Sequence, residues 1–160
     1  MIADKPLAYH ITVGTYGTRL HGDSRGTVDR EHNQYGEPVI GKNDLWLREE
    51  TASLKFPAVR LTDVQRVEVE ILISKVCDRG GWTLLVCAAR EDHVHTLLTT
   101  NSDGQVVRRL LKRWLSEALS GESRRAGGWW AECGSVKWVW TEDYRERAYL
   151  YVREQRTTRT

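Results

Sequence analysis

Residues 82–100 read WTLLVCAAREDHVHTLLTT, in which a charged turn lies between two short apolar runs. The runs cover residues 82–89 and 96–100, and Arg90-Glu91-Asp92 precedes the histidines. Short β-leaning runs joined by a few polar residues predict a β-hairpin. Alternate side chains of a strand point the same way, so we expect His93 and His95 to share one face, with their bases about 7 Å apart.

The His93–His95 pair fits several situations on its own. Polar residues on an edge strand can simply face solvent, whereas two converging imidazoles can bind one metal ion or one phosphate. A purely structural zinc site ranks last, because no third Cys or His lies nearby in the sequence. Other parts of the sequence are needed to choose between solvent exposure, metal binding and phosphate binding.

The composition narrows the class of protein. The chain has 160 residues, of which 40% are hydrophobic, which suits one domain with its own core. No apolar run approaches the roughly 18 residues that span a bilayer, and the N-terminus lacks the apolar centre of a signal peptide. Cys77, Cys87 and Cys133 form no C-x-x-C pair. We therefore expect buried, reduced thiols in a cytoplasmic protein with no membrane association.

The positive charge is concentrated in the C-terminal third. Residues 1–105 hold 12 Lys and Arg against 15 Asp and Glu, whereas residues 106–160 hold 12 against 7. This excess predicts an anionic partner there. The chain also has seven tryptophans, which suit either a core or the stacking of nucleic-acid bases.

The pattern of apolar residues predicts the order strand, helix, strand, strand, helix, strand, helix. Thr62 with Gln65, and Asp143 with Glu146, have the spacing of capping boxes at two of the helix starts. The predicted elements lie at residues 7–13, 63–77, 82–89, 93–100, 106–118, 135–140 and 144–155. We expect an α+β fold, an antiparallel sheet with helices on one face, in a single domain over residues 1–160. Residues from about 15 to 60 show little periodicity and are predicted to be a long loop or insertion, with no role assigned.

The helix at residues 106–118 has one apolar stripe and one basic face. Two like-charge pairs four residues apart, Arg108/Lys112 and Arg109/Arg113, each destabilise an isolated helix slightly. Such a face suits a helix lying along a phosphate backbone, although a merely solvated face is the alternative. These four residues are the candidate DNA-binding set.

The last helix contains two tyrosines that face opposite ways. At 100° per residue, Gln155 lies about 40° from Tyr151, whereas Tyr149 lies about 160° away and is expected, with Val152, to pack on the sheet. Tyr151 and Gln155 can then project together toward the His pair. Two imidazoles and an amide oxygen can hold Mg²⁺ or Mn²⁺, which would polarise a phosphate for attack by the tyrosine.

Another motif, His10-Ile11-Thr12, has the H-x-T form found in one class of phosphoesterases. Those enzymes need two copies, and the other candidate here reads His93-Val94-His95. We therefore set that class aside and expect His10 to be structural or peripheral to the site.

Together these motifs resemble the HUH single-strand DNA transposases with one catalytic tyrosine, and among them the REP-associated tyrosine transposases. The resemblance covers most of the chain outside residues 15–60, and its stretches are residues 9–12, 89–95, 108–114 and 138–155. It implies a ferredoxin-like fold with metal ligands His93, His95 and Gln155 and the nucleophile Tyr151. The family's closest members usually show Y-I-x-x-N-P, whereas this chain has Gln155 in the place of the Asn, which keeps the amide oxygen and adds one methylene.

The resemblance also implies a reaction and a partner. The protein would bind a DNA hairpin, cleave an adjacent single strand and leave a 5′-phosphotyrosine with a free 3′-hydroxyl. It would be nucleoid-associated when bound to DNA, and either a monomer or a homodimer. The alternative is a hairpin-binding regulator of the same lineage without active chemistry.

Overall fold

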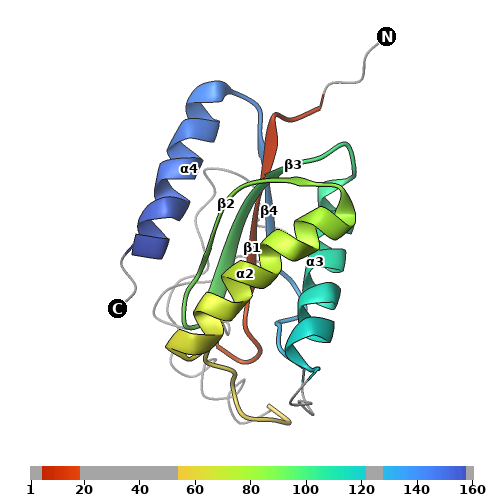
Figure 1. The fold of residues 1–160 in the computed structure, drawn as a ribbon, viewed down its shortest axis with the longest axis vertical. Helices are drawn as coiled ribbons and strands as arrows, with labels where there is room; N and C mark the ends of the chain where they lie inside the picture. Colours follow the sequence, from red (N-terminus) through yellow and green to blue (C-terminus); the bar gives the residue numbers. More distant parts are fainter. Residues whose placement is uncertain (1–4, 19–53, 122–127, 158–160) are drawn as a thin grey trace.

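The computed structural model describes residues 5–18, 54–121 and 128–157. The described elements are β1 (Ala8–Gly14), α2 (Asp63–Gly80), β2 (Thr83–Ala89), β3 (His93–Thr99), α3 (Gly104–Leu119), β4 (Ser135–Val139) and α4 (Glu142–Thr157). Their strands form an antiparallel sheet in the order β2-β3-β1-β4 (Figure 1). The predicted α+β fold and its ferredoxin-like strand order are confirmed.

The predicted hairpin is present, with β2 at one edge of the sheet and β3 inside it. β2 and β3 pair with each other, and the Arg90 N–H donates to the carbonyl of His93 across the turn at 2.8 Å. β3 also pairs with β1, in a register that places Thr12 opposite His95 and Gly14 opposite His93. The His93–His95 strand is therefore an inner strand, not the edge strand that a solvent-facing pair would need.

The helices cover both faces of the sheet, which corrects the prediction that they share one face. α2 and α3 pack on the face that carries Ile11, Val13 and Val94, while Figure 1 shows α4 on the opposite side. There, Ala148 and Val152 of α4 lie in a second apolar cluster. The physical reason is that the strands are apolar on both faces, so each face needs a cover. That second cluster comprises Ala8, Val86, Ala88, Leu97, Val139, Ala148 and Val152.

The two predicted capping boxes differ in their outcome. The capping box of Thr62 and Gln65 is confirmed, with both reciprocal hydrogen bonds present. The predicted box of Asp143 and Glu146 is wrong, because α4 begins two residues earlier and the Thr141 hydroxyl accepts from the N–H of Tyr144 at 3.1 Å. Asp143 instead lies in the first turn, where a carboxylate interacts favourably with the helix dipole.

The long segment predicted at residues 15–60 is described only at its two ends, since residues 19–53 lie outside the described residues. Both ends meet the β2–β3 turn. The N–H of Thr15 donates to the carbonyl of Asp92 at 2.9 Å, and that of Leu61 donates to Glu91 at 2.7 Å. The chain on either side of the segment thus packs beside the histidine hairpin.

The cysteines differ in exposure. None of the three forms a disulfide within the described residues, but only Cys77 and Cys87 are buried, while Cys133 is exposed. The prediction of buried thiols is therefore wrong for Cys133. In the described part of the chain, no helix is both long and apolar enough to cross a membrane.

Candidate active site on the α4 face of the sheet

The two histidines of β3 point to the face that α4 covers, and they converge. Their ring centroids lie 4.8 Å apart, and His93 Nε2 is 3.1 Å from His95 Nε2. His95 is only 5% exposed, and the His93 side chain is 17% exposed. His95 is therefore buried against the sheet, and solvent reaches the pair from the His93 side.

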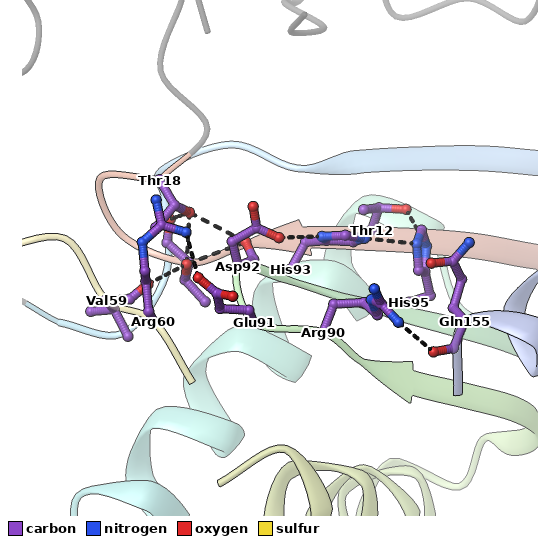
Figure 2. Close-up of polar contacts among 11 residues, drawn as sticks. Thr12, Thr18, Val59, Arg60, Arg90, Glu91, Asp92, His93, His95 and Gln155 are labelled. Atoms are coloured by element: carbon purple, nitrogen blue, oxygen red, sulfur yellow. Dashed lines mark hydrogen bonds and ion pairs between the residues drawn. The ribbon is translucent and has the colours of Figure 1, made fainter. Parts of the chain in front are cut away.

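Asp92 orients the His93 ring. Its Oδ1 lies 2.7 Å from His93 Nδ1, and its side chain is nearly buried (Figure 2). A carboxylate only accepts, so His93 Nδ1 carries the hydrogen that it donates. In the neutral ring this leaves a lone pair on Nε2, the nitrogen that faces His95.

Two side chains of β1 meet the other nitrogen of His95. Thr12 Oγ1 and His10 Nε2 each lie 3.1 Å from His95 Nδ1. Burial, and secondarily the charge of Lys137, lower the pKa of His10 to about 4, so this ring is neutral at physiological pH. His10 is thus in direct contact with a predicted site residue.

The backbone around Asp92 is fixed by threonines from the start of the long segment. The Asp92 carbonyl accepts from the hydroxyls of Thr15, at 3.2 Å, and Thr18, at 3.3 Å. It also accepts from the Thr15 N–H. Sequence reasoning missed these two residues, because nothing local to a Gly- and Thr-containing loop shows that it folds against a turn 74 to 77 residues away.

Tyr151 lies on the same face as the histidines. Its ring centroid is 5.4 Å from that of His95 and 6.2 Å from that of His10. Its side chain is 49% exposed, so the ring borders the histidines while remaining open to solvent. Tyr149, predicted to pack on the sheet, is instead 37% exposed, and Ala148 takes the buried position beside Val152.

Gln155 follows Tyr151 by one helical turn, and Figure 2 draws its contact with Arg90. Its backbone carbonyl accepts from Arg90 Nη1 at 3.0 Å. The following residue, Arg156, places its Nε 3.5 Å from Oε1 of the buried Glu70, whose Oε2 accepts from the N–H of Ala89 at 3.0 Å. We call Glu70, Arg90 and Arg156 the α4 clasp, since they tie the last turn of α4 to the edge of β2.

The donor set fits a divalent cation. Two nitrogens on adjacent positions of one ion, each about 2.1 Å from it, lie about 3 Å apart, and the two Nε2 atoms are 3.1 Å apart. Within the described residues, no three His, Cys, Asp or Glu side chains are grouped to hold a metal ion. The third ligand predicted from the sequence, the amide oxygen of Gln155, is not one of these residue types.

The four basic residues predicted to bind DNA divide into two pairs. Arg108 donates to the carbonyl of Gly134 at 3.1 Å, and Lys112 donates to those of Ala131 and Glu132. Arg109 and Arg113 are exposed on α3, and Arg113 is 3.4 Å from Glu117. The first pair anchors the segment before β4, so only the second pair projects a charged face to solvent.

The chain thus has an antiparallel α+β domain with a histidine pair and a tyrosine on one face. No protein-family model and no curated protein matches it. Among solved structures it is similar to a candidate transposase from Deinococcus radiodurans R1, with 16% identity over 97% of this chain and 93% of that chain and a TM-score of 0.49. It is also similar to a REP-associated tyrosine transposase bound to a REP hairpin, with 13% identity over 99% of this chain and 72% of that chain and a TM-score of 0.47. At these identities and scores the likeness concerns the fold and carries no argument about the reaction.

Proposed function

We propose that this protein is a transposase-like DNA strand transferase, which cleaves single-stranded DNA through a covalent 5′-phosphotyrosine on Tyr151. One observation carries the proposal: the Tyr151 ring lies 5.4 Å from His95, whose Nε2 converges with that of His93. A nucleophile, a cation-binding pair and an open approach thus occur on one face. DNA is proposed as the substrate because the sequence motifs resemble those of the HUH single-strand DNA transposases.

The reaction conserves the energy of the cleaved bond. The Tyr151 oxygen attacks the scissile phosphorus and loses its proton, forming a bond between the tyrosine oxygen and phosphorus. The bond from phosphorus to the 3′ oxygen breaks, and that oxygen leaves with the electron pair and takes up a proton. A second 3′-hydroxyl can reverse the exchange, so strands are joined as well as cut.

His93, His95 and Gln155 are the residues that would hold Mg²⁺ or Mn²⁺. When bound, the ion would polarise the scissile phosphate and stabilise the charge that develops during the exchange. The chain's own contribution is orientation. Asp92 holds one imidazole, β1 holds the other, and the α4 clasp holds the helix that carries Tyr151 and Gln155.

The DNA partner is proposed to be a single strand next to a hairpin. Arg109 and Arg113 on the exposed face of α3 are the residues proposed to contact the phosphate backbone, where each neutralised phosphate makes binding more sensitive to salt. Arg108 and Lys112 belong to the same helix and would contribute positive potential to it while holding the segment before β4.

The test is adduct formation with single-stranded hairpin DNA and Mn²⁺, followed by a denaturing gel. We expect wild-type protein to form an adduct that survives denaturation, and the Tyr151→Phe variant to bind the DNA normally without forming it. Tyr149→Phe is the matched control, since that tyrosine lies on the same helix and is also exposed; it should form the adduct. His93→Ala combined with His95→Ala should abolish the adduct.

Two outcomes would contradict the proposal. An adduct that persists in Tyr151→Phe and is lost in Tyr149→Phe would place the nucleophile on the other side of α4. Tight binding without an adduct at any Mn²⁺ concentration would instead support the alternative, a hairpin-binding regulator without active chemistry.

A further inference from the structure

His95 has hydrogen-bonding partners on both ring nitrogens, and they differ in kind. Its Nε2 faces His93 Nε2, at 3.1 Å. Its Nδ1 faces two groups that can each donate or accept, the Thr12 hydroxyl and His10 Nε2, both at 3.1 Å. The two sides of the ring therefore place different demands on the position of its single proton.

While His93 is neutral, its side of the ring pair favours one proton arrangement without a cation. Because His93 Nδ1 donates its hydrogen to Asp92, the Nε2 of the neutral ring carries a lone pair. A second lone pair on His95 Nε2, 3.1 Å away, would repel it. Without a cation, the His95 proton therefore belongs on Nε2, where it donates to His93.

A bound cation demands the opposite arrangement. Both Nε2 atoms must then offer lone pairs to the ion, because only the unprotonated nitrogen of imidazole is a ligand. The His95 proton has to leave Nε2 and appear on Nδ1. There the Thr12 oxygen or the His10 nitrogen can accept it.

We infer that His10 and Thr12 form a tautomer support for His95, which accepts its ring proton at Nδ1 when a divalent cation binds between His93 and His95. This inference rests on the metal site of the proposed function. The proton moves from one nitrogen to the other of the same ring through exchange with solvent, so no net proton is gained or lost at His95. His10 and Thr12 are positioning residues, which act through His95.

The burial of this group makes the support necessary. His10 is 8% exposed and His95 is 5% exposed, so solvent offers little replacement for a lost partner at Nδ1. An N–H left without an acceptor in such a place is costly. Removing both acceptors should therefore oppose the tautomer that binds the cation.

The experiment records long-range ¹H–¹⁵N spectra of histidine-labelled protein at about pH 8, with and without Zn²⁺ as a diamagnetic probe, and no DNA. In the wild type we expect His95 to carry its proton on Nε2 without Zn²⁺ and on Nδ1 with it. His93 should carry its proton on Nδ1 in both conditions, held there by Asp92. The readout is the proton position itself, which a merely structural role would not move.

The variant His10→Leu combined with Thr12→Val should bind Zn²⁺ about 10–100-fold more weakly, the range typical for lost partners of metal-bound histidines. His10→Leu combined with Thr12→Ser restores one hydroxyl and should recover most of the affinity. Thr96→Val is the matched control: its buried hydroxyl has no hydrogen-bond partner among the described residues, and Thr96 belongs to the same strand as His95. It should bind Zn²⁺ like the wild type.

The inference is overturned if the double variant binds Zn²⁺ with wild-type affinity while its spectrum shows a folded protein, or if His95 keeps its proton on Nε2 in the Zn²⁺ complex. Wild-type protein that binds no Zn²⁺ overturns it as well. Failure of the proposed reaction is a separate result. A protein that shows the tautomer change but never forms a Tyr151 adduct keeps the inference and loses the strand-transfer proposal.

Discussion

The side chains around the histidine pair hold the two imidazoles that are proposed to bind the cation. Asp92 holds His93 at 2.7 Å, and Thr12 and His10 hold His95. Each support touches the Nδ1 atom and leaves Nε2 toward the other ring. Partners of this kind fix the ring orientation and the ring nitrogen that is free to bind.

Sequence spacing predicted part of this arrangement and missed the rest for a physical reason. His93 and His95 share a face because a strand has a period of two, and Tyr151 faces them because a helix has a period of 3.6. The contact of Thr12 with His95 depends on the register between β1 and β3, which pairs residues 83 positions apart. No local pattern encodes that register, so His10-Ile11-Thr12 could be noticed but not placed.

The thiols give a residue-level prediction that depends on pH. Burial, followed by the neighbouring Cys87 and Asp78, raises the pKa of Cys77 to about 12. The thiol is therefore neutral and unreactive at pH 8, where an exposed cysteine with a pKa near 8.5 is about a quarter thiolate. We expect iodoacetamide at pH 8 to label Cys133 alone in the native protein, and all three cysteines in denaturant.

Intact-mass spectrometry and peptide mapping would check the labelling. Raising the pH from 7 to 9 should leave Cys77 unlabelled. Rapid labelling of Cys77 in native protein would contradict the burial of α2 against β2.

Among the elements, α4 stands apart because it alone among the described helices covers its face of the sheet. Its apolar anchors are few, chiefly Ala148 and Val152, so polar contacts at its last turn matter. The α4 clasp supplies them at the end nearest the site. The sequence indicated that this helix carries the nucleophile, but not that Arg90 and Glu70 would hold it.

We predict that Arg90→Gln loosens the last turn of α4. Loss of one charged donor to the Gln155 carbonyl should cost about 1 kcal/mol at this partly buried position, which corresponds to roughly fivefold more frequent opening. Hydrogen exchange at residues 152–157 should accelerate accordingly. Adduct formation should slow by a similar factor, with DNA affinity unchanged.

Arg60→Gln is the control for the clasp, because Arg60 lies before α2 and contacts the same β2–β3 turn through the exposed Glu91. It should leave both hydrogen exchange in α4 and the rate of adduct formation as in the wild type. Equal effects of the two substitutions would argue against a specific role of Arg90.

α3 yields a prediction that separates its two pairs of cations. Replacing Arg109 and Arg113 by Gln should weaken DNA binding and lower the slope of log K against log salt by about one per lost phosphate contact. Lys112→Met should instead lower thermal stability, because Lys112 donates to two backbone carbonyls before β4. Binding titrations at several salt concentrations give the slopes. An unchanged slope in the double Gln variant would indicate that this face of α3 is solvated and does not contact the DNA phosphates.

In the whole molecule, the two faces of the sheet differ in the side chains that they carry. The face toward α2 and α3 holds the larger apolar cluster and stabilises the fold. The face toward α4 combines a small apolar cluster with the histidines, Asp92 and Tyr151. The apolar pattern of the sequence predicted the sheet and its connections; it did not separate these faces, because inner strands that are buried on both sides lose the alternation that marks one face as solvent-exposed.

The measurement that tests the central proposal most directly is the location of a covalent nucleotide on the protein. After incubation with single-stranded hairpin DNA and Mn²⁺, nuclease and trypsin digestion leaves the peptide Ala148–Arg153, which contains both Tyr149 and Tyr151. We predict that fragmentation of this peptide places the phosphonucleotide mass on Tyr151. A mass on Tyr149, or an unmodified peptide from protein that has cleaved the DNA, would contradict the account.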